Sequence, residues 1–153
     1  MKRFRFSLER VLRLRGQETE QAKRELGRAL AAEAQARAAV AEARSELVRR
    51  TDEAGQRERS GLTAYEFASL RTYVTFLQRQ LEATELRLTE AVDETQRRRL
   101  ALLGARRKER ALEKLRERRL EQYQLESLQQ EQKELDEYGS RQTLNSQATE
   151  PDV

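Results

Sequence analysis

The residues of this chain that could take part in chemistry are charged, and the densest group of them is basic. Residues 97–119 contain eleven Lys and Arg but three Glu, and the first fifteen residues contain six basic side chains and one acidic side chain. A concentration of positive charge predicts binding to an acidic protein surface, an anionic membrane or nucleic acid. The candidate partner-binding residues in this block are Arg97, Arg98, Arg99, Arg106, Arg107 and Lys108.

Other side-chain chemistry is poorly represented. The chain has no His and no Cys, which removes the imidazole base, the thiolate nucleophile and the usual zinc ligands. Its six Gly are isolated from one another, so no Gly-rich phosphate loop is present. The many carboxylates need a cleft that perturbs their pKa values before they can act as acids or bases. The sequence therefore predicts no catalytic, cofactor-binding or metal-binding residues, and a protein that is not an enzyme.

The overall composition is typical of long helices. Charged residues make up 38% of the chain and hydrophobic residues 37%, and the single Pro is Pro151. No apolar run approaches the roughly 20 residues that a membrane span needs, so no transmembrane segment is expected. The Arg-rich start could suit a transit peptide, but the apolar pattern continues past it without a break.

Apolar residues in the first half recur at alternating steps of four and three, as in the a and d positions of a coiled coil. Ser7 is a suitable N-cap, and Phe6 and Val11 occupy the flanking hydrophobic positions. A helix is expected over about residues 8–54, with a turn over about 55–62 that contains Gly55 and Gly61. The predicted contact face, with Glu33 as its flaw, is Ala22, Leu26, Ala29, Glu33, Ala36, Val40, Ala43 and Leu47.

The second half predicts a longer helix, over about residues 64–138. Thr63 and Glu66 form a complete capping box at its start. The polar residues 139–153 are expected to be a disordered tail. The predicted contact face begins with Phe67, Leu70, Val74, Leu77, Leu81, Thr84, Leu88 and Ala91, and it changes phase at Leu112 and Leu115 and again at Leu125, Leu128 and Leu135.

Two helices joined by one short turn must run antiparallel. The fold class is therefore expected to be all-α, with residues 1–138 forming a single two-helix antiparallel coiled coil, a helical hairpin with a longer second helix. The expected pairing places Leu47 near Tyr73 and Val40 near Gln80. The second helix would then outrun the first from near Leu115 onward. Its uncovered apolar stripe predicts a partner, with fraying or self-association as the alternatives.

Two segments carry a family resemblance. The first opens the chain and reads Phe4-Arg5-Phe6-Ser7-Leu8-Glu9-Arg10-Val11-Leu12, followed by Arg15 and Glu20-Gln21-Ala22. The second opens the second helix and reads Gly61-Leu62-Thr63, followed by Tyr73, Val74 and Leu77. Both resemble the FliJ family, small coiled-coil proteins of the bacterial flagellar type III export apparatus. The resemblance covers residues 1 to about 138.

The resemblance implies a non-catalytic stalk or adaptor. Its expected partners are the hexameric flagellar export ATPase, the membrane-embedded export gate protein and the export chaperones, and it promotes ATPase assembly and substrate export. The implied location is the cytoplasm, peripheral to the inner membrane at the flagellar base.

The resemblance also implies which residues contact these partners. Tyr73 and Leu77 align with the family's gate-binding strip, whereas Gln80 and Thr84 depart from it. Leu77 also belongs to the predicted contact face, so core packing is its alternative role. Phe76 lies off that face and is a further candidate. By analogy with a rotary stalk, the basic block would meet acidic loops of the ATPase ring.

Two other functions fit the same residues. A generic coiled-coil tether or spacer would need no ATPase contact. A basic nucleic-acid or membrane-surface binder would use residues 97–119, but these contain no aromatic side chain for base stacking, so no nucleic acid is expected.

Overall fold

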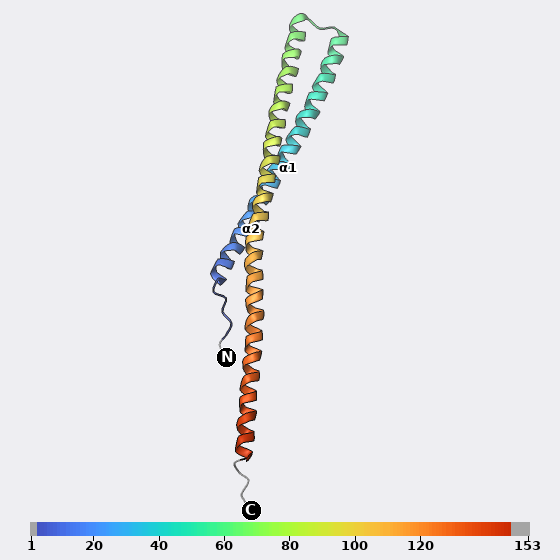
Figure 1. Ribbon diagram of the computed structural model, residues 1–153. Helices are drawn as coiled ribbons and strands as arrows, with labels where there is room; N and C mark the ends of the chain where they lie inside the picture. The colour runs from blue at the N-terminus through green and yellow to red at the C-terminus, as the bar shows by residue number, and fades with distance from the viewer. Residues whose placement is uncertain (1–2, 148–153) are drawn as a thin grey trace, which may run out of the picture. The chain divides into compact units, whose positions relative to one another are not determined.

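The computed structural model describes residues 3–147 and contains two helices. Helix α1 spans Glu9–Ser60 and helix α2 spans Ala64–Gln147 (Figure 1). Within residues 3–147 no strand is present. The predicted fold class is confirmed: the chain is all-α, and its two helices pack as a hairpin with the longer helix second.

The contacts of the chain divide into two compact units. The hairpin unit is Gln17–Arg106, and the terminal unit is Met1–Gly16 together with Arg107–Val153. Each helix contributes residues to both units. The expectation of a single domain over residues 1–138 stays a prediction.

Small side chains form the contact between the helices in the hairpin unit. Every residue of the predicted α1 contact face is buried or half-buried, with Ala29 at 8% and Val40 at 5% exposure. On α2 the buried residues include Thr95 and Leu102. Phe67, predicted to open the α2 face, is exposed instead, because it lies close to the turn. Alanine-rich faces allow helices to approach closely while burying little apolar area.

The turn lies at residues 61–63, later than the sequence indicated. Gly55 remains inside α1, and Gly61 is the one residue within 3–147 that takes the left-handed conformation, with φ of 93°. A residue with a Cβ is strained there, so glycine is the natural helix terminator. The predicted capping box is confirmed: the Thr63 amide donates to Glu66 at 2.9 Å, and the Glu66 amide donates to the Thr63 hydroxyl at 3.3 Å.

The later turn shifts the pairing of the two helices. Arg44 bonds Glu85 and Arg98 bonds Glu25, each at 2.7 Å. Arg50, rather than Leu47, lies against Tyr73. The predicted pairing of Leu47 with Tyr73 is therefore wrong by about one helical turn, because α1 continues to Ser60.

Glu33, the predicted flaw in the contact face, is accommodated by its own helix. Its side chain is 15% exposed and accepts a hydrogen bond from Arg37 at 2.7 Å. That bond is the main reason why the pKa of Glu33 is lowered. A polar residue can occupy such a face when a charged partner satisfies it.

In the terminal unit, the residues before α1 continue the coverage of α2. The rings of Phe4 and Tyr123 lie 5.6 Å apart, and Glu9 pairs with Arg116 at 3.2 Å. Coverage thus reaches Tyr123 rather than ending near Leu115, since the chain that precedes α1 also packs on α2. Helix α2 continues to Gln147, past the predicted end near residue 138. Residues 148–153 of the predicted tail lie outside the described residues.

Candidate partner-binding surfaces

An aromatic patch, defined as Tyr65, Tyr73 and Phe76, lies on one face of α2 near the turn. The exposures of these residues are 83%, 41% and 52%. The Tyr73 and Phe76 rings stack with centroids 6.4 Å apart and planes 21° apart. Together with Ala68, Ser69 and Thr72 the three aromatics line one shallow hollow. Exposed aromatics around a hollow are typical of protein-binding sites, where they anchor the partner.

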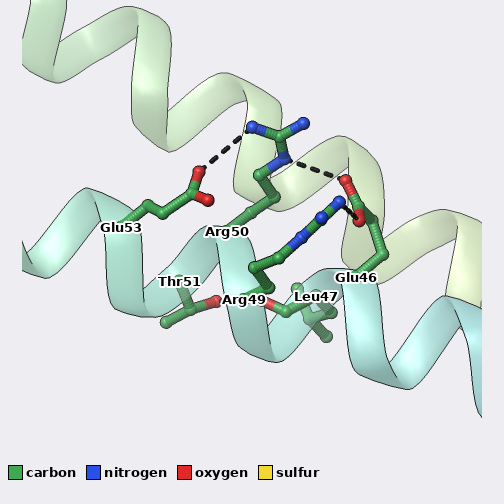
Figure 2. A network of polar contacts seen from close by, with 6 residues as sticks. All are labelled: Glu46, Leu47, Arg49, Arg50, Thr51 and Glu53. Carbon is green, nitrogen blue, oxygen red and sulfur yellow. Dashed lines mark hydrogen bonds and ion pairs between the residues drawn. The ribbon is translucent and has the colours of Figure 1, made fainter.

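Helix α1 supports the patch through Arg50. The Arg50 guanidinium lies 5.9 Å from the centroid of the Tyr73 ring, within reach of a cation–π interaction. Figure 2 shows how it is held: Arg50 donates to Glu46 at 2.8 Å and to Glu53 at 3.0 Å, and Arg49 also pairs with Glu46. The hydrogen bond that Arg50 donates to Glu46 is the main cause of the raised pKa of Arg50. The carboxylates thus fix the cation against Tyr73.

Leu77 differs from its two neighbours in the predicted site. It is half-buried on the contact face, whereas Tyr73 and Phe76 are exposed. Its surroundings favour the alternative role in core packing that its spacing already indicated.

The basic block divides into bound and exposed side chains. Arg98 bridges the helices, bonding Glu94 and Glu25 at 2.7 Å each, and hydrogen bonding by Glu94 is the main cause of its raised pKa. Arg97 pairs with Glu94 at 3.0 Å but leaves 72% of its side chain exposed. Arg98 therefore serves the fold, and Arg97 is available to a partner as well.

The other cations of the block also lie on the surface. Arg99 and Arg106 are exposed in the hairpin unit, and Arg107 and Lys108 are exposed in the terminal unit. Arg99 and Arg106 each help to lower the pKa of one nearby carboxylate, Glu33 and Glu20 respectively. The main causes of these two shifts are the hydrogen bonds from Arg37 and Lys23, so neither Arg99 nor Arg106 is the principal partner of these carboxylates.

Sequence reasoning missed the way in which the N-terminal segment packs. Phe6 is 7% exposed, and the Arg119 guanidinium lies 5.7 Å from its ring centroid and donates to the Ser7 hydroxyl at 2.9 Å. Val11, expected to pack on Phe6, is 37% exposed. The two phenylalanines within three residues were the available sign that this segment packs before the helix starts.

Over the described residues, no group of three or more His, Cys, Asp and Glu could hold a metal ion. Neither helix, within that same part of the chain, is long and apolar enough to cross a membrane.

The fold and these surfaces define a two-helix hairpin protein with exposed aromatic and basic surfaces. The family model described as Flagellar FliJ protein matches residues 4–148, and the chain belongs to that family, which is a family of flagellar export components. Among solved structures, the hairpin is similar to that of CT670 from Chlamydia trachomatis, described as a YscO homolog, with a TM-score of 0.68 and 20% identity over 97% of this chain and 100% of the other. Among curated proteins, none matches the sequence.

Proposed function

We propose that the chain is a stalk and adaptor of the flagellar type III export apparatus. It binds the hexameric export ATPase and the export gate protein, promotes assembly of the ATPase ring, and supports substrate export together with export chaperones. It acts in the cytoplasm, peripheral to the inner membrane at the flagellar base. The observation that carries the proposal is the family match over residues 4–148, which spans both helices and both candidate surfaces.

The basic block is the proposed contact with the ATPase. Arg97, Arg107 and Lys108 are exposed cations that acidic loops of a ring could pair with. Electrostatic recognition of this kind accelerates association and weakens as salt rises. Arg98 is left out of this contact, because it already joins two carboxylates.

The aromatic patch is the proposed contact with the gate protein. Tyr73 and Phe76 are exposed and stacked on each other, and Arg50 lies against the Tyr73 ring, so little side-chain freedom is lost when a partner covers them. Residues of this type dominate the binding energy of many interfaces.

The ATPase contact is tested by measuring turnover and ring formation of the purified export ATPase with the chain added. Reversing charge at the exposed positions, in Arg97→Glu, Arg107→Glu and Lys108→Glu together, should abolish most of the stimulation and its dependence on salt. The matched control reverses three exposed arginines outside the block, Arg57, Arg79 and Arg87. Unchanged stimulation by the first variant, or equal loss in both, would refute the assignment.

The gate contact is tested by binding the chain to the cytoplasmic part of the export gate protein. Truncating an anchor residue of an interface typically costs about 2 kcal/mol. Tyr73→Ala and Phe76→Ala should therefore each weaken binding by roughly thirtyfold. Leu86→Ala is the control, because Leu86 is 61% exposed on the same helix outside the patch. If all three variants bind equally, the patch is not the gate contact.

A further inference from the structure

One face of α2 in the terminal unit is exposed and carries three large apolar side chains at heptad spacing near its end. Leu128, Leu135 and Tyr138 are 62%, 71% and 70% exposed. Large apolar side chains that recur on an exposed helix face indicate an interaction surface. We call it the outer face, and its a and d positions are Arg107, Arg110, Lys114, Glu117, Glu121, Gln124, Leu128, Glu131, Leu135 and Tyr138, all of them exposed.

The two halves of this part of α2 carry opposite charge. Residues 107–119 contain seven basic and three acidic side chains, whereas residues 126–138 contain five acidic side chains and one basic side chain. The net charges are therefore +4 and −4. On the outer face itself, Arg107, Arg110 and Lys114 lie toward one end, and Glu131 lies among apolar residues toward the other. A second copy turned end to end therefore sets these cations opposite Glu131 and the apolar positions.

We propose that the outer face binds a second copy of this chain in an antiparallel, two-fold symmetric dimer. A two-fold interface requires the same patch on both copies, and this charge arrangement meets that requirement. An unrelated partner would have to match both the cations and the apolar positions around Glu131 along one helix face, whereas a second copy matches both at once.

One register satisfies the heptad positions and the charges together. It places Arg107 of one copy opposite Tyr138 of the other, Arg110 opposite Leu135, and Lys114 opposite Glu131. In this register, no two facing a and d residues from the two copies carry the same charge. The aliphatic stems of the arginines cover Leu135, and the Arg107 guanidinium can lie on the Tyr138 ring.

The contacts within one copy are compatible with this dimer. Arg110 pairs with Glu113 at 3.0 Å, but the two side chains are 60% and 39% exposed, so the bond stabilises the monomer little and can be exchanged. Arg116 and Arg119 contact Glu9 and Ser7, so the N-terminal segment occupies a different face and is not displaced. Arg107 belongs to both the outer face and the basic block, so a dimer would mask part of the surface proposed for the ATPase.

Analytical ultracentrifugation of the full chain over a wide concentration range tests the dimer. We expect a reversible monomer–dimer equilibrium that shifts toward monomer at high salt. Lys114→Glu and Glu131→Lys should each weaken dimerisation about tenfold, because each turns two symmetric attractions into repulsions. The double variant K114E/E131K should restore it. Lys133→Glu, the same charge change off the a and d positions, is the control and should leave the dimer unchanged.

A chain that stays monomeric at every concentration, or single variants that the double variant does not rescue, would overturn the proposal. Cross-linking tests the direction, because the chain has no Cys of its own. R107C/Y138C should give a covalent dimer on mild oxidation, since the two positions are about 45 Å apart along one helix and cannot meet within a copy. Equally fast cross-linking by Y138C alone would indicate a parallel pair and contradict the proposed geometry.

Discussion

Two stretches of α2 carry leucine and other apolar residues at helical spacing, yet one stretch is covered and the other is exposed. Leu77 and Leu81 in the hairpin unit are half-buried against α1. Leu128 and Leu135 in the terminal unit are more than 60% exposed. The residue types and spacings are alike, so the difference comes from what lies opposite. Periodicity predicts the helix and the face, whereas burial depends on whether the chain itself supplies a partner.

The largest expected effect comes from placing a charge on the covered face. Val40 is 5% exposed, so Val40→Asp buries an unpaired carboxylate and should lower the free energy of unfolding by about 3 kcal/mol. Urea denaturation followed by circular dichroism measures it. Leu135→Asp, the matched change on the exposed stretch, should cost less than about 0.5 kcal/mol in dilute monomer. Equal losses in the two variants would mean that the stretches do not differ as described.

A second change tests whether the N-terminal segment really covers α2. Phe6→Ala removes a ring that is 7% exposed beneath Arg119, and should destabilise the packing of the segment by about 2 kcal/mol. Hydrogen exchange of the amides around residues 116–123 should accelerate accordingly. Leu14→Ala, at a position 51% exposed, is the control and should leave exchange there unchanged. If Phe6→Ala has no effect on exchange, the covered stretch ends earlier than Tyr123.

The start of the covered stretch depends on the capping box. Thr63→Ala removes the hydroxyl that accepts from the Glu66 amide, and should lower the free energy of unfolding by about 1 kcal/mol. Thr75→Ala is the control, because that hydroxyl only bonds a carbonyl within the helix, and it should change stability by no more than a few tenths of a kcal/mol. A larger loss at Thr75 than at Thr63 would contradict the account.

The smallest effect per residue is expected from pH. Hydrogen bonds from Arg37, Arg50 and Arg98 lower the pKa values of Glu33, Glu46 and Glu94 below their ordinary 4.5. A carboxylate with a lowered pKa stabilises the fold above the unfolded pKa, and this stabilisation is lost as pH falls through the folded pKa.

The melting temperature should therefore stay constant from pH 7 down to about pH 5 and decrease once the pH drops below the unfolded pKa of these carboxyl groups. No change is expected near neutral pH, because the chain has no His. The decrease in melting temperature at acidic pH should become smaller in the triple variant Glu33→Gln, Glu46→Gln and Glu94→Gln. An unchanged decrease would mean that these ion pairs contribute nothing to the fold.

Much of the fold could be predicted from the sequence because its determinants are local. The α1 contact face follows from spacing alone, and the capping box follows from Thr63 and Glu66. The pairing could not be predicted, since Gly55 and Gly61 were equally good turn residues and only the packed helices select Gly61. The contact between Phe4 and Tyr123 joins residues far apart in the sequence within the terminal unit, and no local pattern reports it.

The candidate surfaces were predictable in charge and aromatic content but not in exposure. The density of arginine in the basic block is plain in the sequence, but the double pairing of Arg98 with Glu25 and Glu94 requires the other helix. The support of Tyr73 by Arg50 likewise depends on the register of the helices. Which side chains remain for partners therefore follows from the packing.

The central claim is that the covered stretch builds the hairpin and that the exposed basic block binds the export ATPase. Hydrogen exchange of the chain, alone and bound to the export ATPase, tests it most directly. We predict that amides of residues 97–108 gain protection on binding, whereas those around the turn at residues 61–63 do not. Protection confined to the turn, or no change along the basic block, would contradict the claim.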